Sequence, residues 1–190
     1  MKYMIASDLH GSFQYAEMLL KRFEEEKADM LILLGDLLYH GARNPLPDGY
    51  STMDLTALLN KYKSKIFAVR GNCDSEVDQM VLEFPMSADY NMMYVDGRLW
   101  ILTHGHLFDE HSLIPHEPGA VLLHGHTHVK AMCRLKDEDG VFYFVNPGSV
   151  SLPKDGPMHS YVTYENNCFS MKALDGTVTD TLVLPENPER

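Results

Sequence analysis

The sequence contains few cysteines and few basic residues, and it has no long apolar run. Its 190 residues include three widely spaced cysteines. An odd number at such spacing does not form the disulfide framework of a small secreted protein, so a reduced, cytoplasmic setting is favoured. No apolar run approaches the ~18 residues of a membrane span, and the first residues lack the pattern of a signal peptide. We therefore expect no association with a membrane.

Lysine and arginine are scarce relative to the acidic residues. They number 16 against 27 aspartates and glutamates, which gives a net charge of −11. A sequence-independent grip on nucleic acid depends on basic side chains that neutralise phosphates, so no stable nucleic-acid binding is expected. A small phosphodiester substrate is still compatible with this charge, because bound metal ions would set the local field.

Histidine, in contrast, is concentrated in one part of the chain. Seven of the ten histidines fall between His104 and His128. Neither a hydrophobic core nor a solvated surface requires such a density, so this segment is predicted to bind something.

Five short apolar runs each end at a turn that carries carboxylate, amide or imidazole groups. Such runs suggest buried strands, and ligands collect outside the carboxyl ends of strands in open α/β sheets. One Asp-x-His or Gly-Asp alone is a weak signal that an ordinary turn also satisfies. The five strand ends are expected to converge. The runs are Tyr3–Ala6 before Asp8 and His10, Met30–Leu34 before Asp36, Ile66–Val69 before Asn72, Leu99–Leu102 before His104, and Ala120–Leu123 before His126 and His128.

These side chains form a mixed oxygen and nitrogen donor set without a thiolate. Such a set suits Mn, Fe, Zn, Co or Ni better than it suits a structural zinc site. Two carboxylates and five neutral groups leave two divalent cations with an excess of about two positive charges, or one with a bridging hydroxide. This excess positive charge would attract a negatively charged phosphate substrate.

The motifs resemble the signature of the calcineurin-like metallophosphoesterase superfamily, which runs D-x-H, G-D, G-N-x-D/E, H and G-H-x-H. All five occur here in family order, within roughly residues 1 to 165. The chain is similar to the small, single-domain YfcE-like phosphodiesterases. They also carry cysteine in the Gly-Asn-Cys-Asp turn, here 71–74, and the Asn-Pro-Gly-Ser-Val turn, here 146–150.

The resemblance implies a binuclear metal centre. One metal would be held by Asp8, His10, Asp36 and His128, and the other by Asp36, Asn72, His104 and His126. Asp36 would then bridge the two divalent ions, and a hydroxide shared by them would attack phosphorus in line with the leaving oxygen. Asn72 would help to hold the phosphoryl oxygen. We expect Mn²⁺ first, with Zn²⁺, Ni²⁺, Co²⁺ or Fe as alternatives.

Cys73 departs from the pattern of many superfamily members, which place a histidine there to protonate the leaving group. A thiol with an ordinary pKa of about 8.5 is a weak donor, so poor leaving groups should suffer. His106 is an alternative donor, or else a loop histidine that orients a neighbour. Asp74 is expected to support or cap the turn rather than to orient an imidazole.

The long segment 40–50, directly after the Asp36 turn, is either a functional loop or a plain surface connection. If it is functional, Arg43 and His40 are expected to reach a substrate phosphate.

The predicted fold is α/β, with two packed mixed β-sheets flanked by helices in a four-layer α-β-β-α sandwich. Amphipathic helices are expected after Ser12 and after Ser51, where Asp54 would complete a variant capping box. Asp96-Gly97 and Asp175-Gly176 predict hairpin turns. Residues 1–184 would form a single metallophosphoesterase domain and residues 185–190 a flexible tail. Relatives of this type are often homo-oligomers.

The predicted function is that of a hydrolase, a metal-dependent phosphodiesterase acting on a small phosphodiester. One alternative, a phosphomonoesterase or protein phosphatase, is weakened by Cys73. Another is a non-catalytic interaction module, since the superfamily includes a retromer subunit that uses this fold chiefly as a binding surface. Loss of ligands marks such members, and all seven ligand positions are filled here.

Overall fold

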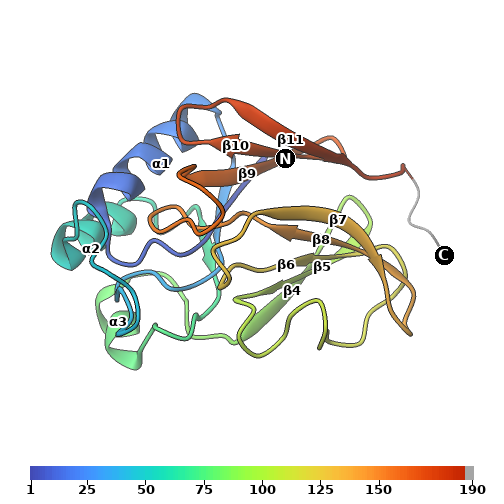
Figure 1. The fold of residues 1–190 in the computed structure, drawn as a ribbon, viewed down its shortest axis with the longest axis horizontal. Helices are drawn as coiled ribbons and strands as arrows, with labels where there is room; N and C mark the ends of the chain where they lie inside the picture. Colours follow the sequence, from blue (N-terminus) through green and yellow to red (C-terminus); the bar gives the residue numbers. More distant parts are fainter. Residues whose placement is uncertain (187–190) are drawn as a thin grey trace.

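Two β-sheets packed face to face form the centre of the protein (Figure 1). The computed structural model describes residues 1–186. One sheet has six strands in the order β11-β10-β9-β1-β2-β3, and the other has five in the order β4-β5-β6-β8-β7. Both contain parallel and antiparallel pairs. The predicted pair of packed mixed sheets is therefore confirmed.

The six-stranded sheet is buried on both faces near its centre. Alternate side chains of β1 point in opposite directions, so that Met4 packs under the helices and Ile5 packs between the sheets. Burial on both sides explains why this strand reads as a continuous apolar run. The strands are β1 (Tyr3–Ala6), β2 (Met30–Leu33), β3 (Ile66–Ala68), β9 (Ser160–Glu165), β10 (Cys168–Ala173) and β11 (Val178–Val183).

The five-stranded sheet has three parallel central strands, β5, β6 and β8, with antiparallel strands at both edges. Parallel strands place their carboxyl ends at one edge, which is where the histidine-rich turns follow. All five apolar runs predicted as strands are confirmed across the two sheets. The strands here are β4 (Tyr90–Val95), β5 (Arg98–Thr103), β6 (Ala120–Leu123), β7 (Ala131–Lys136) and β8 (Val141–Asn146).

Three aromatic side chains fix the two sheets against each other. The Trp100 ring lies 4.7 Å from Tyr164 and 5.3 Å from Phe169, measured between ring centroids. All three are buried, and the Tyr164 hydroxyl donates a 2.9 Å hydrogen bond to the Asp96 carboxylate. Aromatic pairs of this geometry stabilise a core beyond the area that they bury. The sheets therefore form a rigid platform for the turns at their ends.

The helices α1 (Phe13–Glu25) and α2 (Thr52–Asn60) cover the outer face of the six-stranded sheet. The outer face of the other sheet is covered by the segment 105–119, which contains no helix. Leu113 and Ile114 of this segment pack on β5, β6 and β8. The predicted second helical layer is thus replaced by a loop, and Pro115 and Pro118 explain why, since proline is incompatible with a helix interior.

Only one of the two predicted helix-capping interactions is present. Ser12 caps α1 as predicted, because its hydroxyl accepts a hydrogen bond from the Tyr15 N–H. The predicted capping box at α2 is wrong, since the Ser51 hydroxyl donates to the Asp54 carboxylate and makes no bond to the helix backbone.

A capping box occurs instead at α3 (Glu76–Val81), between Ser75 and Asp78. This helix was not predicted, because it has six residues and none of them is buried. It therefore leaves no apolar periodicity in the sequence.

Both predicted hairpin turns are present. Asp96-Gly97 joins β4 to β5 with positive φ at both residues, 48° and 76°, as a type I′ turn requires. Asp175-Gly176 joins β10 to β11.

The segment that follows β11 is hydrogen-bonded to the rest of the fold at Pro185. The carbonyl oxygen of Pro185 accepts a hydrogen bond from the buried Arg98 guanidinium, whose other nitrogen donates to the Gly119 carbonyl at 3.2 Å. Of the predicted tail, residues 187–190 lie outside the described part. The division into one domain and a tail stays a prediction. Within residues 1–186, the helices are too short and too polar to cross a membrane.

Candidate active site

The seven predicted metal ligands meet at the carboxyl ends of five strands. Each ligand lies within reach of another, in a chain of contacts that runs from His128 through Asp8, His10, Asp36 and His104. The remaining two extend it, because the Asn72 amide and the His126 ring both lie beside His104. The strands are β1, β2, β3, β5 and β6.

Backbone strain is concentrated at these residues. Nine non-glycine residues of the described chain have positive φ, and five of them are predicted ligands. The left-handed region is sparsely populated by such residues, and it persists only where the surroundings enforce it. Short main-chain bonds between the turns do so here, such as His10 N–H to the Asp36 carbonyl at 2.9 Å. The five are Asp8 (58°), His10 (47°), Asp36 (55°), His126 (65°) and His128 (61°).

Two glycines permit the turns to approach one another. A Cβ on Gly71 would lie 2.1 Å from the Asp36 carboxylate oxygen, and a Cβ on Gly125 would lie 1.9 Å from the Ser7 hydroxyl. Neither distance is sterically possible for a side chain. The glycines of the Gly-Asn and Gly-His motifs are therefore required by close packing beside the ligands.

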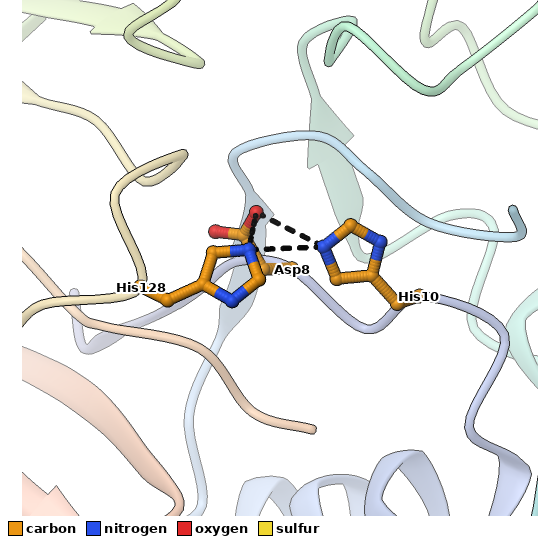
Figure 2. A group of neighbouring side chains, drawn as sticks. All are labelled: Asp8, His10 and His128. Atoms are coloured by element: carbon orange, nitrogen blue, oxygen red, sulfur yellow. Dashed lines mark hydrogen bonds and ion pairs between the residues drawn. The ribbon is translucent and has the colours of Figure 1, made fainter. Parts of the chain in front are cut away.

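Asp8, His10 and His128 point toward a common centre (Figure 2). The His10 Nε2 and His128 Nε2 atoms lie 3.1 Å apart, and both face the Asp8 Oδ1 oxygen at 3.5 and 3.3 Å. The other ring nitrogens are hydrogen-bonded to main-chain carbonyls. His10 Nδ1 donates to Tyr39 at 3.0 Å, and His128 Nδ1 donates to Leu152 at 2.6 Å.

These contacts determine which atoms carry lone pairs. A carbonyl oxygen only accepts, so Nδ1 of each ring must carry its hydrogen and Nε2 of the neutral ring must present a lone pair. When both rings are neutral, two lone pairs face each other next to Asp8 Oδ1, which is buried and has no hydrogen-bond partner. Burial lowers the pKa of His10, but the bond to Asp8 outweighs it and raises the pKa, so in the protein without metal a proton on one ring takes the place of a cation between these atoms. A divalent metal bound through Nε2, with Nδ1 oriented by a carbonyl, fits this arrangement.

A second group repeats the pattern around His104. Its Nδ1 donates to the Leu34 carbonyl at 2.7 Å, and its Nε2 faces the Asn72 Oδ1 at 3.1 Å and the Asp36 Oδ2 at 3.4 Å. Asp36 Oδ2 also lies 3.7 Å from His10 Nε2. The Asp36 carboxylate thus stands between the two groups and faces an imidazole of each.

The titration behaviour of the imidazoles follows from their surroundings. Burial lowers the pKa of His104, but the Asp36 and Asp8 carboxylates outweigh it and raise the pKa to about 9. Burial and the neighbouring His104 lower the pKa of His126 to about 4, so its ring is neutral at pH 7. The neutral ring is the form that binds a metal. The His126 main-chain N–H donates to Asp8 Oδ2 at 3.0 Å, which holds the turn in place.

Comparison with known proteins places this arrangement in a family. The model of the calcineurin-like phosphoesterase superfamily domain matches residues 1–167. The chain belongs to that superfamily. Phosphodiesterase YfcE of Escherichia coli strain K12 is 43% identical to this phosphoesterase over 175 residues, which are 92% of this chain and 93% of the relative.

Solved structures agree with the family. YfcE, a phosphoesterase from E. coli, superposes with a TM-score of 0.90 at 41% identity and covers 97% of this chain and 100% of its own. An archaeal phosphodiesterase gives 0.59 at 18% identity, with coverage of 97% and 100%. Zinc-bound Vps29 from Entamoeba histolytica gives 0.60 at 18%, with coverage of 96% and 98%. The last two likenesses show the fold alone.

Cys73 lies at the edge of the phosphoesterase centre. Its Sγ is within 4.8 Å of ligand atoms of His10 and Asp36, and its main-chain N–H donates to Asp36 Oδ1 at 2.8 Å. Burial, followed by the charge of Asp36, raises the pKa of the Cys73 thiol to about 12. The thiol is therefore neutral and a poor proton donor at pH 7.

His106 is half-buried beside the centre. Its ring lies 5.4 Å from His104 and 6.2 Å from His126 between centroids, and its Nδ1 is buried without a hydrogen-bond partner. Burial, together with His104, lowers its pKa. His106, like His40, is not among the residues that line the cavity beside the centre.

A cavity of about 650 Å³ opens beside the centre. Arg43 lines it, as expected, whereas His40 is not among the lining residues and packs its ring edge-on against Tyr39 and Tyr50. Lys154 lines the cavity and was missed by the sequence analysis. The full lining is Asp36, Tyr39, Gly41, Ala42, Arg43, Asn44, Asn72, Cys73, His126, Thr127, His128 and Lys154.

Asp74 joins the turn after β2 to the turn after β3. Its buried carboxylate accepts main-chain N–H bonds from Asp36 at 2.8 Å, Leu37 at 2.7 Å and Gly71 at 2.7 Å. Burial raises its pKa to about 6, although the bonds from Leu37 and Gly71 act in the opposite direction. Asp74 therefore holds Asp36 in position without facing the centre.

Replacing Asp74 by asparagine should destabilise the fold, because the amide NH₂ would face N–H donors that the carboxylate now satisfies. The amide oxygen can still accept the bonds from Asp36 and Gly71, which share one carboxylate oxygen, so one buried N–H is left unsatisfied and we expect the free energy of unfolding to fall by about 1–3 kcal/mol at pH 8. Urea denaturation of metal-free protein measures this. Asp54→Asn, at an exposed residue bonded only to the Ser51 hydroxyl, is the control. Equal losses in the two variants would contradict the assigned role.

Proposed function

We propose that this phosphoesterase is a metal-dependent phosphodiesterase that hydrolyses a small phosphodiester at a two-metal centre. The observation that carries the proposal is the convergence of atoms that bind metals, Nε2 of His10, His128 and His104, with the unpartnered Asp8 Oδ1 beside the first two. The 43% identity to Phosphodiesterase YfcE, over nearly the whole of both chains, supports the choice of a diester.

The proposed ligands of one metal are Asp8, His10, Asp36 and His128. Those of the other are Asp36, Asn72, His104 and His126. The position of Asp36 Oδ2, 3.7 Å from His10 Nε2 and 3.4 Å from His104 Nε2, supports its role as the shared ligand. Two divalent ions, when bound, supply a hydroxide nucleophile near neutral pH and neutralise the phosphoryl oxygens.

The chain's own residues orient the substrate and move protons. The Asn72 amide is held beside His104 and supplies a contact to a phosphoryl oxygen. Arg43 lies across the cavity wall and adds a positive charge for a substrate phosphate. We assign no proton-donor role to Cys73, because a thiol is a weak general acid in comparison with an imidazole. His106, with an unbonded ring nitrogen, is the remaining candidate for the leaving-group proton.

The donor set favours first-row transition metals, with Mn²⁺ proposed first and Zn²⁺, Ni²⁺, Co²⁺ or Fe as alternatives. All three cysteines are free thiols, in keeping with a reducing, cytoplasmic setting. Homo-oligomer formation and the absence of stable nucleic-acid binding stay predictions.

A phosphomonoesterase is the second candidate, and Cys73 in place of a histidine donor argues against it. A non-catalytic binding module on the same fold is the third. The presence of all seven ligand side chains argues against that role.

Removal of metal should abolish turnover. We expect protein treated exhaustively with a chelator to be inactive on bis-p-nitrophenyl phosphate, and activity to return with Mn²⁺ or a neighbouring transition metal, because the chain's own side chains supply no nucleophile in this scheme. Release of nitrophenolate after reconstitution with Mn²⁺, Zn²⁺, Ni²⁺, Co²⁺ and Mg²⁺ in turn is the measurement. Full activity in the chelated protein would contradict the proposed metal-dependent function.

Cys73→His should favour substrates whose leaving group needs a proton. General acid catalysis is worth roughly 10²- to 10⁴-fold when the geometry is right. The rate on an alkyl phosphodiester should therefore rise far more than the rate on the nitrophenyl diester, both assayed with the same metal. His106→Ala is the parallel variant. An unchanged rate ratio in Cys73→His, with a collapsed ratio in His106→Ala, would assign the proton to His106 alone.

A further inference from the structure

Two basic side chains line the cavity without a partner of their own. Within residues 1–186, neither the Arg43 guanidinium nor the Lys154 ammonium makes an ion pair or a hydrogen bond, although both lie in the cavity wall. Several other basic side chains of this acidic chain are paired with carboxylates. Lys2 and Lys172 both contact Glu26, for example. Unpaired cations in a cavity are available to an anionic ligand.

The loop that carries Lys154 is fixed to the candidate centre. Its main-chain N–H donates to the His128 carbonyl at 3.1 Å. The next residue, Asp155, forms a 2.5 Å ion pair with Lys130. The ammonium group of Lys154 is thus presented from a turn that is tied directly to a proposed metal ligand.

The loop that carries Arg43 is fixed on the Cys73 side. The Asn44 main-chain N–H donates to the Gly41 carbonyl at 3.1 Å, and its side-chain amide donates to the His40 carbonyl at 2.8 Å. A Cβ on Gly41 would lie 2.9 Å from Cys73 Sγ, so the two segments are in close contact. Arg43 and Lys154 therefore come from two separately anchored loops.

The charge of the cavity wall differs from that of the whole chain. The net charge is −11, yet among the described residues the only carboxylate in the lining is Asp36, a proposed metal ligand. Two metals with their ligands keep an excess of about two positive charges, which suffices for the single negative charge of a diester. The positive charges of the Arg43 and Lys154 side chains add to this excess, and together they exceed what a simple diester requires.

We propose that Arg43 and Lys154 form a second anion subsite, and that the substrate is a phosphodiester with an additional phosphate or carboxylate away from the scissile phosphorus. This inference rests on the proposed function. Charge-assisted bonds from guanidinium and ammonium groups suit such an anion. The cationic wall also disfavours substrates whose remote group is positively charged.

Binding of two matched nucleotides tests the subsite without turnover. Thymidine 3′,5′-bisphosphate and thymidine 5′-monophosphate are titrated calorimetrically into Mn²⁺-loaded protein, because they differ only in the second anion. We expect the bisphosphate to bind at least about tenfold more tightly, a difference of the size that one bond to a charged group supplies. Arg43→Gln and Lys154→Gln should each reduce this ratio severalfold, and the double variant should bring it close to one.

The matched control is Lys136→Gln, which removes one exposed lysine charge outside the cavity and should leave the ratio as in the wild type. Equal weakening of both nucleotides would mean that Arg43 and Lys154 hold the phosphate at the metals, and would overturn the subsite. A wild-type ratio near one would do the same. Turnover of bis-p-nitrophenyl phosphate by the same Mn²⁺-loaded protein is measured separately. Its absence would contradict the proposed function, while the binding ratio would still decide the subsite.

Discussion

Hydrogen-bond acceptors that face one another at the strand ends are the feature on which the rest of the structure depends. His10 and His128 direct their Nε2 atoms at each other across 3.1 Å, with the unpartnered Asp8 Oδ1 alongside. A buried acceptor without a donor is costly, so Asp8 Oδ1 requires a positive charge beside it. Nδ1 of each ring is fixed by a carbonyl, and a divalent cation between the three atoms would be coordinated by all of them.

The remainder of the fold holds these atoms close together. Five ligand residues adopt left-handed backbone conformations, which only an over-determined framework maintains. The aromatic contacts around Trp100 join the two sheets, and the Asp74 carboxylate joins two of the turns. Because Trp100 lies on a strand and Asp74 is hydrogen-bonded to the main chain of two turns, the ligand positions are fixed in the structure without a metal. The loops that carry Arg43 and Lys154 line the cavity and so determine which substrates fit into it.

The central strands and the turns that carry the proposed metal ligands could be predicted from the sequence, because each is marked by residues that lie close together in the chain. Each apolar run is followed within a few residues by its polar turn, so strand and ligand are read together. Helix α3 left no such signal, since none of its six residues is buried. The packing of segment 105–119 and the place of Lys154 depend on contacts between distant segments, such as the bond from Lys154 to His128. His40 shows the limit of inference from loop position, because its ring packs edge-on against Tyr39 and Tyr50 and is not among the cavity-lining residues.

The central claim is that one carboxylate, Asp36, faces both cation positions. Electron paramagnetic resonance of protein loaded with two Mn²⁺ per chain tests this directly, because ions that share a carboxylate are magnetically coupled. The account predicts an exchange-coupled signal for the wild type, and only isolated Mn²⁺, at fewer than two ions per chain, for Asp36→Asn. An isolated-ion spectrum at every loading of the wild type, or a coupled signal that survives in Asp36→Asn, would contradict it.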